Sequence, residues 1–565
     1  MGYLGRTTLV LVWVGLLLTL GSGVPVQQSA AAGDEGDEQA AGLPEGFSVR
    51  IDPRMELLAV VQHFSTWAPG GHIKSRTTYK RDIDDYFAGF EEHRAVAWMD
   101  SLVAAEFTHD APVRLILHHQ DPPDLRRRTP YSDYLITRAG GEPILDAFVA
   151  ALRDFARATD FMAFYRAHRP LYDLHVREVC ASLAGKDYVR ALEEFFGESR
   201  DGYHLILPPL FAGGYGPGIQ DKDRYDLYAV IGPCARKDDR TTFGCRRYLE
   251  SIMLHEWSHS FVNPLVDQWA DEFRASARLF DPIRGMMTRQ AYPSWKIALY
   301  EHIVRAAEIN IRATLYEDFD KESALRVHEG QGFWYVGPVD SLLEVYQAHR
   351  EQYASFGRFV PVIARALSQL SIDELPLRVT SFSGPLSGVF PRAERIYLVY
   401  PTGSDHGISG IRSLDEEMIR RLQVELEGFA GFLASFQMPS RIISDREAMA
   451  IDWKDKVAFV YGSGGGNLFL RSLEMAVPLE VAEGTLEFAG ERYAGEGIVL
   501  ISCLPNPFNA TLPFVVCVAN RPEDLIGLGE RVSSPEEWEA DYILYRGDER
   551  LAAGRYRRMD GAWRR

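Results

Sequence analysis

The sequence predicts an α+β protein: a helix-rich domain around a small sheet, then a β-rich connecting region and a small α/β domain. Two dense helical patterns support the first part, one from Ile144 to Phe196 and one from Ser341 to Leu370. After Pro376 the composition changes, because short β-like runs alternate with Gly- and Pro-rich turns. A chain of 565 residues is expected to form two or three domains. We place the boundaries at 47–375, 376–450 and 451–565.

The first residues have the features of a secretory signal peptide. Leu9 to Leu20 form an apolar run behind Arg6, shorter than the roughly twenty residues that a membrane-spanning helix needs. We assign residues 1–25 to the signal peptide and the acidic, Ala- and Gly-rich residues 26–46 to a disordered tether. An uncleaved anchor is the alternative. We expect an exported protein, periplasmic or extracellular, with no membrane span once the signal is removed.

The five cysteines fit an exported protein without forming a disulfide framework. Cys234 and Cys245 flank a short polar loop and could close it with a disulfide. Cys503 and Cys517 lie on two apolar segments and could pair across them, which leaves Cys180 over. The alternative is that all five are reduced.

Residues 255–259 read His255-Glu256-Trp257-Ser258-His259. Two histidines four apart on a helix lie one turn from each other, so both imidazoles can reach one metal ion. Glu256 then lies beside the open coordination position, where a carboxylate can take a proton from water. The pattern predicts a zinc site with His255 and His259 as ligands and Glu256 as general base. The structural alternative is a helix with two core histidines.

The residues around this motif favour a buried helix. Arg246 to Leu254 contains no Gly or Pro, and Tyr248, Ile252 and His255 follow one another at helical spacing. Pro264 disfavours helical backbone at the residue before it. We therefore expect the helix to end soon after the second histidine.

A catalytic zinc needs a third protein ligand. The Gly and His that one class of zinc peptidases carries just beyond the motif are absent here. A glutamate from a later helix is the other solution. The helical pattern from Ser294 to Ile309 offers Glu301 and Glu308 on one face, with Arg305 between them. We favour Glu301 as the third zinc ligand and keep Glu308 as the alternative, because Arg305 can pair with either carboxylate. If neither glutamate binds metal, the three side chains form a row of ion pairs, Glu–Arg–Glu, on the helix surface.

The last two segments carry strand and helix patterns in alternation. Arg395 to Tyr400 and Val379 to Phe382 are β-like, and Leu414 to Met438 has a helical pattern. Lys456 to Tyr461 is a buried-strand signal that runs into the Gly-rich loop Gly462 to Asn467. The spacing of these glycines departs from Gly-x-Gly-x-x-Gly, so a nucleotide site is not predicted. Further short strands are expected at 485–488, 497–501 and 514–518.

The motif and its surroundings resemble those of gluzincin-type zinc metallopeptidases. The features in common are His-Glu-x-x-His-Ser-Phe-x-Asn-Pro from His255 and a later helix with Trp295, Glu301 and Arg305. The chain is more closely similar to an uncharacterised family of secreted bacterial proteins classed as a domain of unknown function. This second resemblance covers roughly residues 48–370 and includes the stretches 56–61, 213–216 and 331–335.

The resemblance implies a zincin-like fold, zinc at His255, His259 and Glu301, and Glu256 as general base. Gluzincins usually follow the third ligand with a carboxylate that orients a histidine, whereas Arg305 stands in that neighbourhood here. The resemblance also implies that an exposed strand upstream of the zinc helix pairs with an extended peptide.

We expect that strand at Tyr225 to Ile231, with the loop Gly213 to Gly218 lining the cleft or acting as a flap. A donor that stabilises the tetrahedral intermediate should lie near the third ligand. The available residues are Tyr292, His302, His328 and Tyr335, among which the sequence does not choose.

Net charge limits the partners. The formal charge of −18 argues against a nucleic-acid ligand. The sequence thus predicts an exported zinc-dependent peptidase that acts on a peptide or protein. The alternative is a non-catalytic extracellular or envelope binding protein with a structural or vestigial zinc site. Glu256 favours the enzyme, because a purely structural zinc site does not require it.

Overall fold

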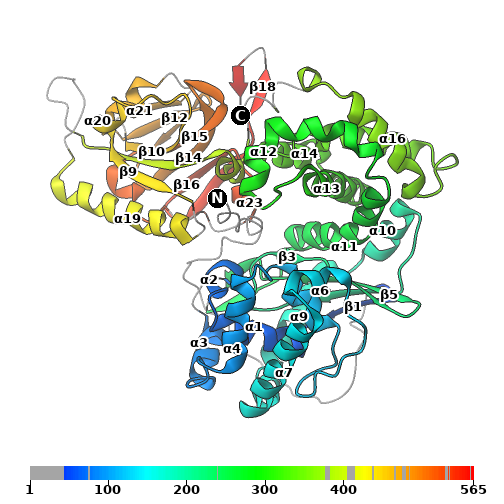
Figure 1. Cartoon of the computed structure of the whole chain (residues 1–565). Coiled ribbons are helices and arrows are strands. Elements are labelled where there is room, and N and C mark those ends of the chain that lie inside the picture. Colours follow the sequence, from blue (N-terminus) through cyan, green and yellow to red (C-terminus); the bar gives the residue numbers. More distant parts are fainter. Residues whose placement is uncertain are drawn as a thin grey trace, which may run out of the picture. The chain divides into compact units, whose positions relative to one another are not determined.

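The computed structural model has an α+β fold, as the sequence predicts (Figure 1). It describes residues 43–564 except 74–76, 238, 376–378, 380–381, 383, 404–413, 436–437, 464–465, 474–478, 483, 529–531, 533–534 and 560–561. The expected signal peptide and most of the expected tether lie outside the described residues. The chain divides into two compact units. The first consists of residues up to Ser276 with Leu299–Lys321 and Pro338–Ser368, and the second consists of Ala277–Ala298, Glu322–Gly337 and Gln369–Arg565.

The first unit is mostly helical and contains the helices that the sequence predicts between Ile144 and Phe196. Its elements are β1 (Phe47–Arg50), α1 (Pro53–His63), α2 (Ala68–Gly71), α3 (Thr78–Tyr86), α4 (Arg94–Ala104), α5 (Asp110–Leu117), α6 (Asp133–Ala139), α7 (Glu142–Ala158), α8 (Phe161–Ala167), α9 (Arg169–Leu183), α10 (Tyr188–Phe196), β2 (Gly202–Ile206), β3 (Gly214–Tyr215), β4 (Gly218–Asp221), β5 (Arg224–Ile231), β6 (Ala235–Lys237), β7 (Arg240–Thr242), α11 (Arg246–Gln268), most of η1 (Glu272–Leu279), α13 (Trp295–Leu315) and α15 (Val336–Ala348), and α16 (Phe356–Gln369).

Local sequence explains where these helices begin and end. In α10 the Asp187 side chain accepts from the main-chain nitrogen of Arg190, and Gly197 ends the helix in the left-handed conformation. The apolar face of α7 includes Leu145, Phe148 and Leu152, which are completely buried. The helical pattern of the sequence therefore marks the buried face correctly.

The sheet of the first unit has the strand order β1-β2-β5-β3, and β4 also pairs with β5. Strands β1, β2 and β5 are parallel, whereas β3 and β4 run antiparallel to β5. Gly214 pairs with Ile231, and Gly218 pairs with Leu227, so β3 and β4 share one register along the same side of β5. The expectation that residues 225–231 form an exposed strand is wrong. Strand β5 has neighbours on both sides, and the edge is formed by β3 and β4.

Helix α11 packs against β5 and does not end at Pro264. The expected stop is wrong, although proline removes one helical hydrogen bond at a cost of about 3 kcal/mol. Packing offsets this cost. Phe261 is buried and its ring stacks on that of Phe196 at 4.5 Å, and Val266 beyond the proline is also buried. Tertiary contacts outweigh the local preference here.

The cysteines behave in two ways. Cys234 and Cys245 form a disulfide across the β6–β7 hairpin, which confirms that predicted pairing. The pairing of Cys503 with Cys517 is wrong, because both thiols are free and buried. Their strands pair in a register that places Cys503 opposite Val515, so the two cysteines are diagonal neighbours. Diagonal positions lie about 7–8 Å apart, beyond the usual Cα separation of a disulfide.

The second unit contains a mixed sheet of seven strands in the order β17-β16-β14-β15-β10-β8-β9. Strands β8 and β9 precede residue 450 and share this sheet with later strands, so the boundary expected at residue 450 falls inside it. The middle of the expected strand at Val379 to Phe382 and part of the Gly-rich loop after Tyr461 lie outside the described residues. The remaining elements are α12 (Phe280–Arg289), α14 (Lys321–Gly330), η2 (Ile372–Glu374), η3 (Leu386–Gly388), α18 (Val389–Arg392), β8 (Ile396–Tyr400), α19 (Glu416–Ser435), β9 (Ser440–Ser444), α20 (Asp445–Ala448), β10 (Val457–Ser463), α21 (Leu468–Ser472), β11 (Leu479–Ala482), β12 (Thr485–Phe488), β13 (Glu491–Ala494), β14 (Ile498–Asn506), β15 (Asn509–Ala519), η4 (Pro522–Leu525), α23 (Pro535–Trp538), β16 (Tyr542–Arg546), β17 (Glu549–Gly554), β18 (Arg557–Met559) and β19 (Ala562–Arg564).

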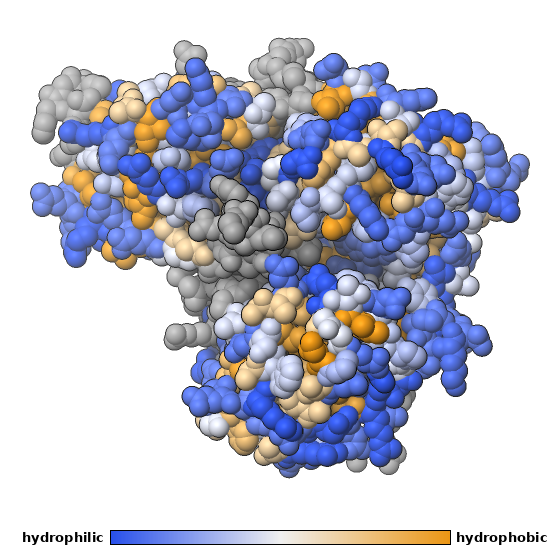
Figure 2. Space-filling view, in the orientation of Figure 1, coloured by the Kyte–Doolittle hydropathy of each residue, from blue (hydrophilic) through white to orange (hydrophobic). Residues whose placement is uncertain are grey.

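The surface in Figure 2 is mainly hydrophilic, with hydrophobic residues in small groups. Among the described residues, no helix combines the length and the apolar character needed to cross a bilayer.

Candidate metal centre

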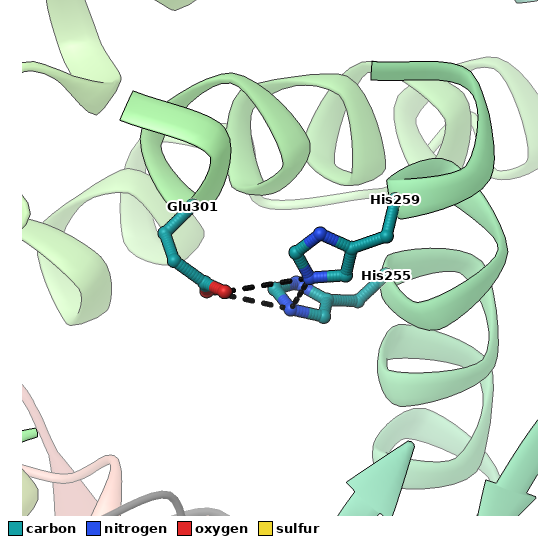
Figure 3. A group of neighbouring side chains, drawn as sticks. All are labelled: His255, His259 and Glu301. Carbon is teal, nitrogen blue, oxygen red and sulfur yellow. Dashed lines mark hydrogen bonds and ion pairs between the residues drawn. The ribbon is translucent and has the colours of Figure 1, made fainter. Parts of the chain in front are cut away.

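Three side chains in the first unit converge on one point, as Figure 3 shows. His255 and His259 come from α11, and Glu301 comes from α13. The Nε2 atoms of the two histidines lie 3.1 Å apart. The Glu301 Oε2 atom is 3.5 Å from Nε2 of His255, and its Oε1 atom is 3.4 Å from Nε2 of His259. Among the described residues this is the one cluster of histidine, cysteine or acidic side chains with the spacing of a metal site.

These distances fit a small divalent cation. Ligand atoms that each lie about 2.0–2.2 Å from a tetrahedral ion are roughly 3.4 Å from one another. Two imidazoles and one carboxylate also form a ligand set that leaves a fourth position open. The three residues can therefore hold a metal ion.

Packing on the opposite side of α11 fixes the two histidines. Trp257 is completely buried, and its ring meets those of Phe47 and Tyr203, each at 5.2 Å between centroids. Both histidines remain partly exposed. The helix thus turns its apolar side to the sheet and presents its two imidazoles on the other side.

Two further residues hold the ligands by hydrogen bonds. Nδ1 of His259 lies 3.1 Å from Oδ1 of Asn263, one helical turn later. A proton on Nδ1 is donated to this oxygen, which leaves the lone pair of Nε2 free for an ion. Arg305, one turn after Glu301, donates to Oε2 of Glu301 at 3.1 Å. Both contacts are between residues four apart on one helix.

The structure decides between the two glutamates of α13. Glu308 is buried and accepts a hydrogen bond of 2.9 Å from Arg312, and it does not belong to the cluster. Glu301 is the carboxylate that faces the histidines. Arg305 pairs with this same carboxylate, a choice between Glu301 and Glu308 that the sequence leaves open.

The charges of the cluster favour a cation. Burial opposes ionisation of Glu301, but His259, His255 and Arg305 together hold the pKa of Glu301 well below its usual range. Burial lowers the pKa of His259, but the hydrogen bond and charge of Glu301 outweigh it and raise this pKa to about 9. The site therefore attracts positive charge at neutral pH.

Glu256 lies next to these ligands without belonging to their group. Its carboxylate is partly buried, and burial, followed by the charge of Glu301, raises the pKa of Glu256 to about 7, against the opposing effects of His259 and Arg305. A carboxyl group with a pKa near 7 is suited to taking a proton at neutral pH. The position and the pKa together suit a general base.

The edge strand lies directly over Glu256. A Cβ atom on Gly214 would be 2.9 Å from Oε1 of Glu256, and one on Gly216 would be 2.8 Å from its Oε2. The expectation that the loop 213–218 lines the site is consistent with this placement. Sequence reasoning missed Asn263 and the individual roles of these glycines. Asn263 stands four residues after His259, which is the spacing of neighbours on a helix face. Because the sequence predicts a helix end near Pro264, this spacing does not enter the prediction.

The predicted donors near the third ligand find little support. His302 is completely buried. Tyr335 donates its hydroxyl hydrogen to the main-chain oxygen of Leu279 at 2.6 Å. Tyr292 and His328 remain candidates from the sequence alone.

The comparisons with known proteins identify one family. A family model described as "Domain of unknown function (DUF4932)" matches residues 47–366, a range that contains every residue of the cluster and Glu256. No curated protein matches the chain significantly.

Proposed function

The chain belongs to the DUF4932 family, and from its metal cluster we propose that it is an exported zinc-dependent metallopeptidase of the gluzincin-like type. The observation that carries the proposal is the placement of Glu256. Three side chains can hold a metal ion and leave one position open, and a carboxylate outside this group lies near His259 and Glu301. A structural metal site has no use for that carboxylate.

Zinc is the metal we propose for His255, His259 and Glu301. Two neutral imidazoles and one carboxylate are the protein ligands of a large class of catalytic zinc sites. Zinc in such a site polarises a substrate carbonyl and makes a neighbouring water more acidic. The remaining chemistry belongs to the side chains of the chain.

Glu256 is the group that we propose takes the proton from the attacking water. Burial holds its pKa near 7, so a large fraction of the carboxyl is ionised at neutral pH and can accept a proton. The same group in its protonated form can then return the proton to the leaving amine. Asn263 and Arg305 keep His259 and Glu301 in place during these steps.

The edge strand offers a way to hold an extended peptide. Strand β3 pairs with β5 on one side only. In the antiparallel register the main-chain oxygens of Gly213 and Pro217 accept from Gly232 and Tyr228 of the β5 segment. The main-chain groups of the alternate residues Gly214 and Gly216 therefore point away from β5, where a peptide can pair with them. This arrangement supports a peptide or protein as the proposed substrate.

Export is part of the proposal. The apolar run behind Arg6 and the disulfide between Cys234 and Cys245 both support it. We expect the mature protein to begin between residues 22 and 33, which amino-terminal sequencing of the secreted protein measures.

The first experiment measures zinc in the purified mature protein and in two matched variants, Glu301→Ala and Glu308→Ala. Both remove a buried carboxylate from α13, and circular dichroism checks that each variant folds. We expect about one zinc per chain in the wild type and in Glu308→Ala, and loss of zinc in Glu301→Ala. A folded wild type that takes up no zinc, even when zinc is supplied, refutes the proposal.

The second experiment separates catalysis from metal binding. Glu256→Gln keeps the size of the side chain and removes its ability to accept a proton. We expect this variant to keep its zinc and to lose about 10²–10⁴-fold in kcat against a mixture of quenched fluorescent peptides. Cleavage by neither protein would favour the non-catalytic alternative, in which the zinc site is structural. Equal cleavage by both proteins would show that Glu256 is not the general base.

A further inference from the structure

Edge strand β3 and the residue that follows it lie over Glu256 and include two glycines whose backbone conformation does not require glycine. Gly213 has a φ of +83°, a left-handed value that favours glycine. Gly214 and Gly216 have no such φ. The reason for glycine at these two positions is therefore steric.

Gly214 and Gly216 face different parts of helix α11. A Cβ atom on Gly214 would lie 2.7 Å from Cγ2 of Ile252 and 2.9 Å from Oε1 of Glu256, both side-chain atoms. A Cβ atom on Gly216 would meet the main-chain oxygen of Glu256 closer than real atoms approach, and would lie 2.8 Å from its Oε2. The bare backbone of the strand therefore lies against both oxygens of the carboxylate.

Van der Waals contact, and not a hydrogen bond, holds the Glu256 carboxylate in place. Within the described part of the chain no hydrogen bond to either oxygen of Glu256 is found, and its electrostatic neighbours act only through charge. The position of the carboxylate is set by the helix beneath it and by the two glycines above it.

We propose that Gly214 and Gly216 are positioning residues. Gly214 sets where the Glu256 carboxylate lies, and Gly216 sets how closely the edge strand approaches α11. The inference rests on the proposed peptidase function for its consequence in catalysis, but the packing itself does not depend on that function. Misplacement of a catalytic group by about 1 Å can cost on the order of 10²-fold in rate.

The two glycines predict different couplings with Glu256. Alanine at position 214 clashes with side-chain atoms, so removal of the Glu256 side chain should relieve part of the strain. Alanine at position 216 clashes with a main-chain oxygen, which stays in place when that side chain is removed. A double-mutant cycle on stability detects this difference without any measurement of activity.

The stability experiment compares Gly214→Ala and Gly216→Ala, each alone and combined with Glu256→Ala, in zinc-free full-length protein. Gly244→Ala is the control, because a Cβ atom there would make only an ordinary contact of 3.5 Å with Thr242. We expect a lower Tm for both test variants, with a loss that shrinks in the Glu256→Ala background for position 214 and persists for position 216. Equal losses in both backgrounds at position 214 would overturn its assignment to the carboxylate.

The functional experiment measures zinc affinity by competition with a chelator, and kcat and KM with quenched fluorescent peptides. We expect Gly214→Ala to bind zinc within about threefold of the Gly244→Ala control while kcat falls on the order of 10²-fold and KM changes less. A purely structural role would instead reduce zinc affinity and activity together. Unchanged kcat in Gly214→Ala overturns the inference and leaves the peptidase proposal intact.

A failure of the proposed peptidase function would be seen in the wild type and not in the glycine variants. A wild type that binds no zinc and cleaves no peptide refutes the peptidase. The stability cycle then still decides whether the glycines position Glu256. If Gly216→Ala does not fold, the comparison at position 214 alone carries the test.

Discussion

At the scale of single residues, the candidate metal centre depends on two supporting side chains that are not ligands. Asn263 contacts Nδ1 of His259, and Arg305 donates to Oε2 of Glu301. Each lies one helical turn after the ligand that it holds. In both α11 and α13, a residue four positions further along the helix therefore orients the ligand. Arg305 also brings a positive charge beside a site for a cation. This charge weakens binding of the ion, but the hydrogen bond fixes the carboxylate that binds it.

Asn263 allows a direct test of this support. Asn263→Ala removes the acceptor for Nδ1 of His259, so the ring loses its orientation and its preferred tautomer. We expect zinc affinity to fall about 10–100-fold, as is usual when such a partner is removed. Asn263→Asp is the control, because it keeps an acceptor at the same place. Competition with a chelator measures both variants, and equal affinities for Asn263→Ala and wild type would contradict the role.

At the scale of elements, α11 continues through Pro264 and thereby places Asn263 in helical conformation. The proline leaves the main-chain oxygen of Ser260 without its helical donor. We expect Pro264→Ala to raise the free energy of unfolding by about 1–2 kcal/mol, because the restored hydrogen bond exceeds the gain in unfolded-chain entropy. Urea denaturation measures the change. A less stable variant would show that the proline ring itself packs in a way that alanine cannot replace.

The disulfide hairpin leads directly into the same helix, since Cys245 is the residue that precedes α11. The Cys234–Cys245 bond closes a loop of 11 residues, and loops of this size contribute about 2–3 kcal/mol by restricting the unfolded chain. We expect the double variant Cys234→Ser/Cys245→Ser to lose about that much stability, as does the wild type under a reductant. Cys180→Ser serves as the control for a free thiol. No effect of reductant on the wild type would contradict the prediction.

Comparison of particular elements shows what the sequence can predict. The histidine pair and Glu256 depend only on helical spacing, and Glu301 depends on a helix free of Gly and Pro, so local patterns suffice for them. The position of β5 inside the sheet depends on pairing between distant segments, which local patterns do not contain. The same reason explains the error at Cys503, whose partner across the strands is Val515. The role of Gly214 requires the distance between a strand and a helix, which no one-dimensional pattern gives.

At the scale of the whole molecule, both units bury carboxyl groups, such as those of Glu308 and Asp541. Glu56 on α1 is an example, with only 1 % of its surface exposed. The Tyr79 hydroxyl donates to Oε2 of Glu56 and lies 2.8 Å from the hydroxyl of Tyr172, so one carboxyl group joins α1, α3 and α9. No described side chain neutralises its charge by an ion pair. Its protonation therefore bears on the stability of the first unit.

The pH dependence of stability follows from this carboxyl group. Burial, with a smaller contribution from the charge of Asp52, raises the pKa of Glu56 to about 8 against the opposing effect of the hydrogen bond from Tyr79. The unfolded chain, with a pKa near 4.5, loses its proton first as pH rises, so the folded state binds more protons between about pH 4.5 and 8. The stability that this group contributes is therefore fully present below pH 4.5 and falls by about a few kcal/mol as the pH rises towards 8.

Glu56→Gln keeps an acceptor for Tyr79 and cannot ionise. We expect its stability relative to the wild type to increase steadily from pH 5 to pH 8, as measured by urea denaturation at several pH values. Because the other titrating groups are the same in both proteins, a difference that does not change with pH would show that Glu56 ionises normally in the fold.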